Sequence, residues 1–395
     1  MLTTIAGLIS LLIWIYLLAA RGEFWRVRHL IPPESGPGKI QGTVAVIIPA
    51  RNEAGVLAKS LRSLLDQSCS EFLHIFVVND SSTDSTAEIA REAAASAGKT
   101  ILTVLEGQPL PSGWSGKVWA MHQGVESARK LNPRFLLFAD ADIVHQPESV
   151  SRLVALAEAG AFDMASYMVK LHCETLAERF LIPAFVFFFF KLYPPRWIVD
   201  PKRRTAGAAG GCILLRPEVL DRCGGLVSIR NEIIDDCALA RQVKRTGGRL
   251  WLGLTNSAKS IRPYRSLGEI GRMISRTAFN QLNHSTVLLF MSLLGLFMTY
   301  LLPPLLLFSH SWPARTLGAV TWIAMALSYL PVVRFYRLNP LWTITLPLIT
   351  LYYMGATLHS AIQFWSGKGG KWKGRVQDVR GAEPQPKPTT ETRRH

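Results

Sequence analysis

The feature that most constrains this chain is a set of four long apolar segments. They cover residues 3–20, about 287–308, 316–336 and 340–364. A helix needs about 20 mostly apolar residues to cross the hydrocarbon core of a bilayer. Hydrophobic residues make up 49% of the 395-residue chain, which is also typical of a protein that lies partly in lipid. We therefore expect an N-terminal transmembrane anchor at 1–21 and C-terminal transmembrane segments over 287–364.

The positive charges near the first apolar segment indicate its orientation. A cleaved signal peptide would carry them before the apolar run, whereas Arg21, Arg26 and Arg28 all follow it. The segment therefore reads as an anchor, with the chain after it in the cytoplasm. Much of the net charge of +16 lies beside apolar segments or in terminal tails, which suits an anionic membrane surface. No zinc-finger or RNA-binding signature is present, so nucleic acid is not an expected partner.

The C-terminal apolar segments raise a problem of topology. If the chain after the anchor is cytoplasmic, three full crossings place the basic residues 367–375 outside, whereas the positive-inside rule places them inside. We therefore expect one of the three segments to form a hairpin or to fail to cross. The first contains Pro303 and Pro304 and is a candidate for a kinked or re-entrant segment. Residues 365–395 read as a basic and then disordered tail.

Between the apolar ends, residues 43–265 have the pattern of a soluble domain, preceded by a Pro/Gly-rich linker at 22–42. Strands are expected at 43–50, 72–80, 100–107 and 134–142, and helices at 53–67, 84–97 and 116–131. This alternation predicts an α/β domain with a mostly parallel sheet and helices on both faces. Five cysteines without CxxC spacing predict neither a disulfide framework nor a zinc site, and they favour a reducing compartment.

Two aspartates, Asp140 and Asp142, end the fourth expected strand. Ligands of such sheets bind beyond the carboxyl ends of the strands, and side chains two residues apart share one face of a strand. Two carboxylates there predict a site for Mg²⁺ or Mn²⁺, with diphosphate oxygens and water completing the coordination. The alternative is a pair of turn or N-cap residues before a helix that begins near "HQPES" (145–149).

Asp80 ends the second expected strand in the same way, within "VVNDSSTDST" (77–86). Its carboxylate suits a nucleobase N–H, whereas Asp84 or Ser82 is expected to cap the helix that follows. The "PARNE" turn after the first strand is either another wall of this pocket or a plain strand-to-helix turn. Its polar side chains are Arg51, Asn52 and Glu53.

Basic and small residues are further candidates. Lys117 begins a helix, where a lysine beside helix-terminal amides suits a phosphate or a carboxylate, although a solvated surface lysine is the plain alternative. Gly210 and Gly211 would let the backbone approach a substrate closely. Two more aspartates, Asp235 and Asp236, open an amphipathic helix. They are either helix-start caps or, in the case of Asp236, a general base for an acceptor hydroxyl.

Two segments are expected at the membrane surface. Residues 181–195 are apolar but broken by prolines and Lys191, and we expect them to lie in the membrane interface. The alternative for them is a buried core helix or strand. The basic amphipathic stretch 266–286 precedes the first C-terminal apolar segment. Its Arg272 and Arg276 lie on one helical face, where they would meet lipid phosphates or a diphosphate leaving group.

The order of these motifs resembles a known family. The stretches "VIIPARNE", "VVNDSSTDST", "GK" before a helix, "FADAD", "AAGGC" and "DDCALA" look like the inverting family 2 glycosyltransferases with a GT-A fold, over about residues 43–280. "PLPSGWSGKVWA", "IPAFVFFFF" and "IDDCALARQVKRTGGRLWLGLT" are similar to the hopene-associated glycosyltransferases of bacterial hopanoid pathways, which are relatives of ceramide glucosyltransferase. The resemblance implies a multi-pass protein of the bacterial inner (cytoplasmic) membrane, with its catalytic domain facing the cytoplasm.

The resemblance also implies roles for single residues. Asp140 and Asp142 match the DxD pair that holds the metal and the diphosphate. Asp236 matches the catalytic base of the [ED]D motif, although the usual glutamate is Asp235 here. Processive members carry QxxRW, whereas "MISRT" (273–277) keeps only its arginine, Arg276. The residues that match the nucleotide-contacting part of the family are Asp80 and, beside it, Ala50, Arg51 and Glu53.

We therefore expect a membrane-bound inverting glycosyltransferase that moves one sugar from a nucleotide-diphosphate sugar to a lipid acceptor hydroxyl, in hopanoid or isoprenoid lipid metabolism. The alternative is a processive polysaccharide synthase. A nicotinamide-dependent oxidoreductase is disfavoured because no GxGxxG follows the first strand. A transporter or a structural membrane protein is disfavoured because neither needs acidic residues at two strand ends.

Overall fold

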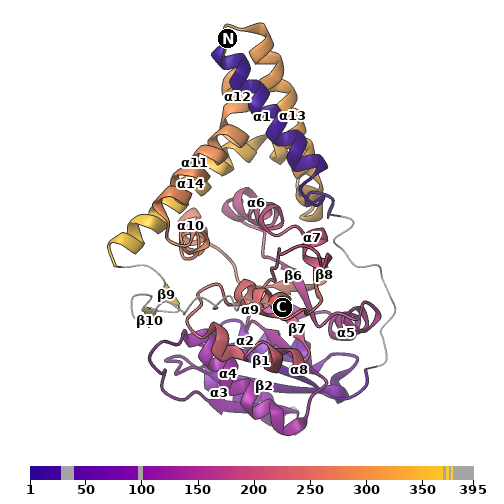
Figure 1. Cartoon of the computed structure of the whole chain (residues 1–395). Coiled ribbons are helices and arrows are strands. Elements are labelled where there is room, and N and C mark those ends of the chain that lie inside the picture. Colours follow the sequence, from indigo (N-terminus) through magenta and orange to yellow (C-terminus); the bar gives the residue numbers. More distant parts are fainter. Residues whose placement is uncertain (28–39, 97–100, 368–370, 373–374, 377–395) are drawn as a thin grey trace, which may run out of the picture.

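The computed structural model describes residues 1–27, 40–96, 101–367, 371–372 and 375–376. An α/β domain lies at one end and apolar helices lie at the other, with helix α6 between them (Figure 1). Most of the expected linker at 22–42 and of the expected tail at 365–395 lies outside the described residues.

The α/β domain contains one eight-stranded sheet with the order β3-β2-β1-β4-β7-β6-β8-β5. The strands β1 to β4 are parallel to one another, β6 is parallel to β8, and β7 is antiparallel to both of its neighbours. The strands are β1 (Val44–Ala50), β2 (Leu73–Asn79), β3 (Leu102–Glu106), β4 (Phe135–Ala139), β5 (Ile143–His145), β6 (Met164–Lys170), β7 (Cys212–Leu215) and β8 (Leu250–Ser260), with a separate short pair β9 (Lys371–Trp372) and β10 (Arg375–Val376).

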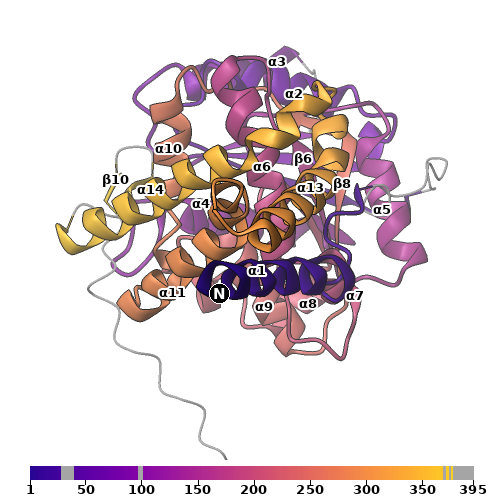
Figure 2. The same cartoon turned by 90° about the horizontal axis from the view of Figure 1, so that it is seen from above.

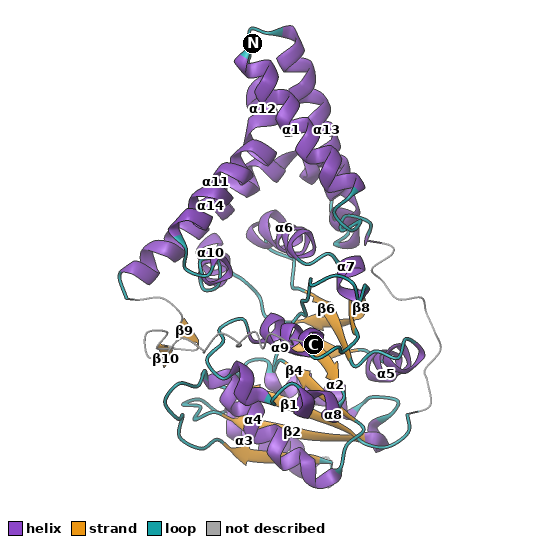
Figure 3. Ribbon diagram, viewed as in Figure 1, coloured by secondary structure: helices purple, strands orange, loops and turns teal. Residues whose placement is uncertain are grey.

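Helices cover both faces of this sheet, as the alternation of strands and helices predicted (Figure 3). In β1, Ala45 and Ile47 pack in the same core cluster as Val118 of α4, whereas Val46 and Ile48 pack in a second cluster with α2. Such a strand is buried on both faces, which explains its continuous apolar sequence. The helices of the domain are α2 (Leu57–Leu65), α3 (Thr86–Ser96), α4 (Gly116–Ala128), α5 (Ser149–Ala159), α6 (Leu176–Leu192), α7 (Pro195–Val199), α8 (Pro217–Arg222), α9 (Asp235–Arg245) and α10 (Leu267–Ser275).

Four helical segments of the described chain are long and apolar enough to cross a membrane, judged by length and composition. In the second of them, a π-helical turn at Phe297–Leu301 precedes Pro303 and Pro304. The helix is therefore irregular where the two prolines were expected to disturb it. The four segments are α1 (Leu2–Ala19); α11 (Thr286–Leu296) with α12 (Leu302–Leu306); α13 (Trp312–Phe335); and a 3₁₀ turn (Pro340–Thr345) with α14 (Leu346–Trp365).

Helix α6 corrects the interpretation of residues 181–195. Its Phe187 is buried and packs against Phe24, which follows α1, and against Tyr329 of α13. Leu181 and Phe190 are also buried. Because other helices cover these side chains, α6 is the buried helix of the alternative interpretation and does not lie open in the membrane interface.

Candidate active site

The predicted residues after β1 and β2 lie side by side. The register of the two parallel strands places Ala50 opposite Asn79, and the Asp80 amide donates to the Ala50 carbonyl oxygen at 2.8 Å. Arg51 Nη1 donates to the Asp80 carbonyl oxygen at 2.6 Å and lies 3.6 Å from Asp80 Oδ2. The Asp80 side chain is only 2% exposed, so the guanidinium of Arg51 compensates a charge that is largely removed from water.

The two turns after these strands are also tied together. Asp84 or Ser82 was expected to cap α3, and Asp84 does so. Its Oδ1 accepts from the Thr86 amide at 3.1 Å. Its Oδ2 accepts from the Ala54 amide at 3.2 Å. Ser82 Oγ accepts instead from the Asn52 amide at 3.1 Å. The turns therefore form one continuous wall at the carboxyl edge of the sheet.

Asp142 lies beyond the end of β4, in the turn before β5. Its Oδ2 accepts hydrogen bonds from Ser260 Oγ at 2.8 Å and from Arg262 Nε at 3.1 Å. The guanidinium of Arg262 also pairs with Glu53 of the "PARNE" turn. Burial raises the pKa of Asp142, and the nearby Asp140 adds to the rise, while Arg262 opposes it. Arg262 therefore pairs with both Glu53 and Asp142, which are 89 residues apart in the sequence.

Arg262 and Ser260 were not among the residues predicted from the sequence. Ser260 is the last residue of β8, and Arg262 follows two residues later. The antiparallel pairing of β8 with β5 places Ser260 opposite Ile143. Residues 250–260 form a strand of 11 residues, and the apolar stretch "LWLGL" within it was a signal for that strand. With that strand recognised, an arginine directly after it would have been a candidate for the same edge of the sheet.

Lys117 lies among three of the predicted carboxylates. Its Nζ is 3.0 Å from Asp140 Oδ1 and 3.3 Å from Asp235 Oδ2. Burial lowers the pKa of Lys117, but the charges of Asp140, Asp235 and Asp236 outweigh burial and raise it above its ordinary value. The lysine is therefore a permanent cation at the start of α4. Its partners in the structure are carboxylates, one of the two kinds of partner that the sequence suggested.

Gly210 allows this cluster to pack closely. A Cβ atom at Gly210 would lie 3.2 Å from Asp236 Oδ2 and 3.3 Å from Lys117 Nζ. At Gly211, a Cβ would lie 3.1 Å from a methyl carbon of Val169 and 3.4 Å from Ile143. Gly210 therefore borders the charged cluster, whereas Gly211 is closely packed against apolar side chains of the sheet.

Asp236 has the environment expected of a general base. Its Oδ2 accepts from the Gly210 amide at 2.8 Å, and its Oδ1 accepts from the Cys237 amide at 2.7 Å. Burial raises the pKa of Asp236 to about 6, Asp235 adds to the rise, and Lys117 opposes it. A carboxylate with a pKa just below neutral is both deprotonated at pH 7 and a stronger proton acceptor than an ordinary aspartate.

Arg276 lies at the C-terminal end of α10 and is exposed. Among the described residues, no hydrogen bond or ion pair of its side chain is found. Burial raises the pKa of Tyr264, the charge of Asp142 adds to the rise, and the charges of Arg262 and Arg276 oppose it. Arg276 therefore lies near the Asp142 side of the candidate site.

A divalent metal fits the two DxD carboxylates only together with a bound donor. Among the described residues, no group of three or more His, Cys, Asp or Glu side chains could hold a metal. Asp140 faces Lys117 and Asp142 faces Arg262, so the pair offers two carboxylates. Mg²⁺ is commonly bound by one or two carboxylates together with substrate phosphates and waters, so this donor set fits such an ion. The metal ligands Asp140 and Asp142 stay a prediction.

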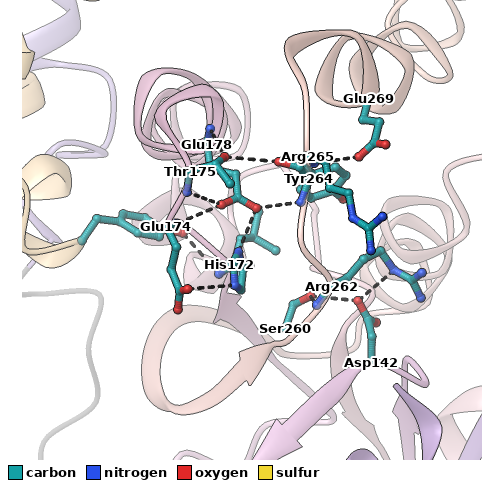
Figure 4. A network of polar contacts seen from close by, with 12 residues as sticks. Asp142, His172, Glu174, Thr175, Glu178, Ser260, Arg262, Tyr264, Arg265 and Glu269 are labelled. Carbon is teal, nitrogen blue, oxygen red and sulfur yellow. Dashed lines mark hydrogen bonds and ion pairs between the residues drawn. The ribbon is translucent and has the colours of Figure 1, made fainter. Parts of the chain in front are cut away.

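A buried carboxylate connects the site to the helices above it (Figure 4). Glu178 of α6 is 0% exposed and accepts four hydrogen bonds. One comes from the Tyr264 amide at 2.7 Å, two residues after Arg262. The others come from His172 Nδ1 and from the amides of Glu174 and Thr175. Glu178 therefore fixes the chain that carries Arg262 against the first turn of α6.

We expect Glu178→Gln to lower the free energy of unfolding by about 3 kcal/mol at neutral pH, because one buried amide donor would face the new NH₂ group and the charge is lost. Burial raises the pKa of Glu178, but the Thr175 and Tyr264 amides outweigh it and lower the pKa to about 2. This stabilisation is present above the ordinary value of 4.5 and is lost as the pH falls toward 2.

Thermal unfolding of the detergent-solubilised chain measures this effect. Glu174→Gln is the matched control, since the Glu174 side chain is 81% exposed. Equal transition temperatures for the two variants would contradict the role of Glu178.

Comparisons with known proteins identify similar sequences and a similar fold. Residues 45–224 match the sequence profile of glycosyl transferase family 2. The 4,4'-diaponeurosporenoate glycosyltransferase of Staphylococcus aureus (strain bovine RF122 / ET3-1) is 36% identical over 101 residues, which are 26% of this chain and 24% of that protein. The same enzyme of strain USA300 is 36% identical over 100 residues, again 24% of its length. The match thus spans about a quarter of these curated relatives.

A solved structure shows the fold. The mannosyltransferase PcManGT from Pyrobaculum calidifontis, in complex with GDP-Man and Mn²⁺, superposes with a TM-score of 0.57 at 18% identity. The superposition covers 90% of this chain and 99% of that one. The chain therefore has the GT-A fold, and its residues 45–224 are similar to glycosyl transferase family 2.

Proposed function

We propose that the protein is a membrane-bound inverting glycosyltransferase that moves one sugar from a nucleotide-diphosphate sugar to the hydroxyl of a lipid. The observation that carries the proposal is the position of Asp236. Its carboxylate, with a pKa of about 6, lies beside the Lys117–Asp140 pair at the carboxyl edge of the sheet. A general base is thus held next to the residues that we assign to the donor diphosphate.

In this mechanism the nucleotide lies against Asp80 and the turn of Ala50, Arg51 and Glu53. A divalent ion held by Asp140 and Asp142, when bound, supplies Lewis-acid chemistry at the diphosphate. Asp236 takes the proton of the acceptor hydroxyl, and the oxygen forms a bond to the anomeric carbon. The bond from that carbon to the diphosphate oxygen breaks on the opposite face, so the configuration inverts.

The remaining residues position these groups. Lys117 offsets the repulsion between Asp235 and Asp236, because it provides one cation within the cluster. Gly210 donates to Asp236 and orients its carboxylate. Arg276 is exposed on the Asp142 side, where it is available to the leaving diphosphate.

We assign the acceptor to the lipid phase because helices long and apolar enough to cross a membrane pack on the side of the α/β domain where α6 lies (Figure 1). The curated relatives are named for the glycosylation of diaponeurosporenoate, which supports an apolar acceptor. A hopanoid or another isoprenoid lipid is our proposed acceptor class. The proposed location is the bacterial inner membrane, with residues 43–265 as the catalytic domain on its cytoplasmic side.

The test is transfer from a panel of radiolabelled nucleotide sugars to a lipid extract, in membranes that contain the full chain. We expect label in the organic phase, as a lipid that carries one sugar. A labelled polymer would favour a processive polysaccharide synthase, and absence of transfer with every donor would contradict the proposal.

Chelation tests the metal separately. Because the two DxD carboxylates are expected to hold the ion together with the donor, excess EDTA should lower transfer at least a hundredfold, and added Mg²⁺ or Mn²⁺ should restore it. Full activity in excess EDTA would contradict a metal-held diphosphate.

A further inference from the structure

The apolar helices differ in how far they extend from the α/β domain. At the far end of the bundle, Thr4 Oγ1 of α1 lies 3.2 Å from Ser311 Oγ, which precedes α13. At the near end, the last turn of α13 rests on the domain. The Leu171 amide donates to Tyr336 Oη at 3.3 Å, and Lys170 Nζ donates to the Phe335 carbonyl oxygen at 3.3 Å. Helix α13 therefore runs the full length from the far end to the domain.

Helix α14 contacts a layer that lies above the α/β domain. This layer consists of α6, α10 and the segment after α10. Just before its start, the ring of Trp342 lies 6.4 Å from that of Phe180 of α6, and near its middle Tyr353 Oη donates to the Leu181 carbonyl oxygen of α6 at 3.1 Å. One residue earlier, Tyr352 Oη donates to the Leu267 carbonyl oxygen of α10 at 2.6 Å. Near its end, Ser360 Oγ accepts from the amide of Phe279 at 3.1 Å, in the segment after α10.

These contacts show that α14 does not rise from the layer at a right angle to it. A helix of 20 residues is about 30 Å long, so a crossing helix would touch the layer at one end only. In the view from above, α14 extends lengthwise across α6 (Figure 2). Both of its ends therefore lie on the side of the α/β domain.

The exposed side of α14 is apolar apart from His359. Leucines, an isoleucine and a tryptophan recur at helical spacing and are 42–63% exposed, whereas Leu346, Ile349 and Ala361 on the inner side are buried. Phe290 and Met291 of the neighbouring α11 are also exposed. The exposed residues of α14, here called the α14 stripe, are Leu348, Leu351, Leu358, Ile362 and Trp365.

We infer that α14 does not cross the membrane but lies along its domain-side surface, with the α14 stripe in the acyl chains. The stripe continues the apolar surface of α11, and α14 contains no Asp, Glu, Lys or Arg, so acyl chains fit this surface better than water. The chain then crosses three times, with α1, α11–α12 and α13. Lys371 and Arg375, which follow α14, then lie on the side of the catalytic domain, which satisfies the positive-inside rule.

Sidedness of labelling tests the inference and does not depend on enzymatic activity. A single cysteine is appended after His395 in the full chain, in sealed membrane vesicles, and treated with a membrane-impermeant thiol reagent. References are Lys130→Cys, exposed on the α/β domain, and His310→Cys, exposed at the far end. The unmodified chain is the blank, because its native cysteines are free but buried or half-buried.

We expect the appended cysteine to be labelled from the same side as Lys130→Cys. Labelling from the side of His310→Cys would overturn the inference. The stripe is tested with a nitroxide at Leu351→Cys or Leu358→Cys in liposomes. Relaxation by oxygen, which concentrates in acyl chains, should exceed relaxation by a water-soluble nickel chelate, and the reverse order would show that the stripe faces water and would overturn its placement in lipid.

Discussion

Asp236→Asn is expected to lower the turnover number about a thousandfold, the size of a lost general base. The substitution keeps the volume of the side chain and one oxygen that can accept from the Gly210 amide, so the chain should fold. The donor contacts that we assign to Asp80 and the DxD pair are untouched, and nucleotide binding should be nearly unchanged. Turnover and nucleotide affinity, measured on the same preparation, separate the two effects.

The control for this substitution is Asp221→Asn. Asp221 forms an exposed ion pair with Arg129, away from the charged cluster, and its loss should leave turnover near wild type. A wild-type turnover number in Asp236→Asn would remove Asp236 from the role of base. A loss of nucleotide binding that equals the loss of turnover would indicate a structural role instead.

Lys117→Met should be the most destabilising of the proposed changes in the site. Removing one partner of a buried charge cluster costs about 3–5 kcal/mol, because Asp140, Asp235 and Asp236 are left without their common cation. Chemical denaturation of the purified chain measures this loss. Lys130→Met is the matched control, since Lys130 is exposed.

Lys117→Met should also change the pH dependence of transfer. Lys117 lowers the pKa of Asp236, so its loss should raise that pKa above about 6. The base acts only when deprotonated, so the acid limb of the pH–rate profile should move to higher pH. An unchanged acid limb in a folded variant would show that Asp236 does not titrate in the profile.

The sequence predicted the first half of the sheet and its acidic edge well. In β1, every residue is buried, and a continuous apolar run that ends in a polar turn is a local signal. Asp80 follows β2 in the same way, and parallel pairing then brings Asp80 beside Arg51. Local pattern and a general rule about parallel sheets were sufficient for these residues.

Arg262 and Glu178 could not be predicted by such a rule. Arg262 meets Asp142 because β8 pairs antiparallel with β5, a contact between segments more than 100 residues apart. Glu178 meets Tyr264 because α6 folds back over the chain that follows β8. Neither residue has a local pattern that distinguishes it from an ordinary surface arginine or an N-terminal capping glutamate.

The apolar segments show a similar limit. Residues of α6 and α14 have compositions that fit a membrane span, an interfacial helix or a buried helix. The neighbouring elements distinguish these cases. Residues after α1 and helix α13 cover Phe187 of α6, whereas α6, α10 and α11 cover one side of α14 and leave the α14 stripe exposed. The sequence therefore predicted apolar surroundings, but the partner of each surface followed from the fold.

In the proposed mechanism, Asp236 activates a lipid hydroxyl for direct attack on the anomeric carbon of a nucleotide-bound sugar. The most direct measurement is the anomeric configuration of the glycolipid made by the full chain, determined by NMR and compared with that of the donor. A single displacement predicts the opposite configuration in product and donor. A product that retains the configuration of the donor would contradict this mechanism.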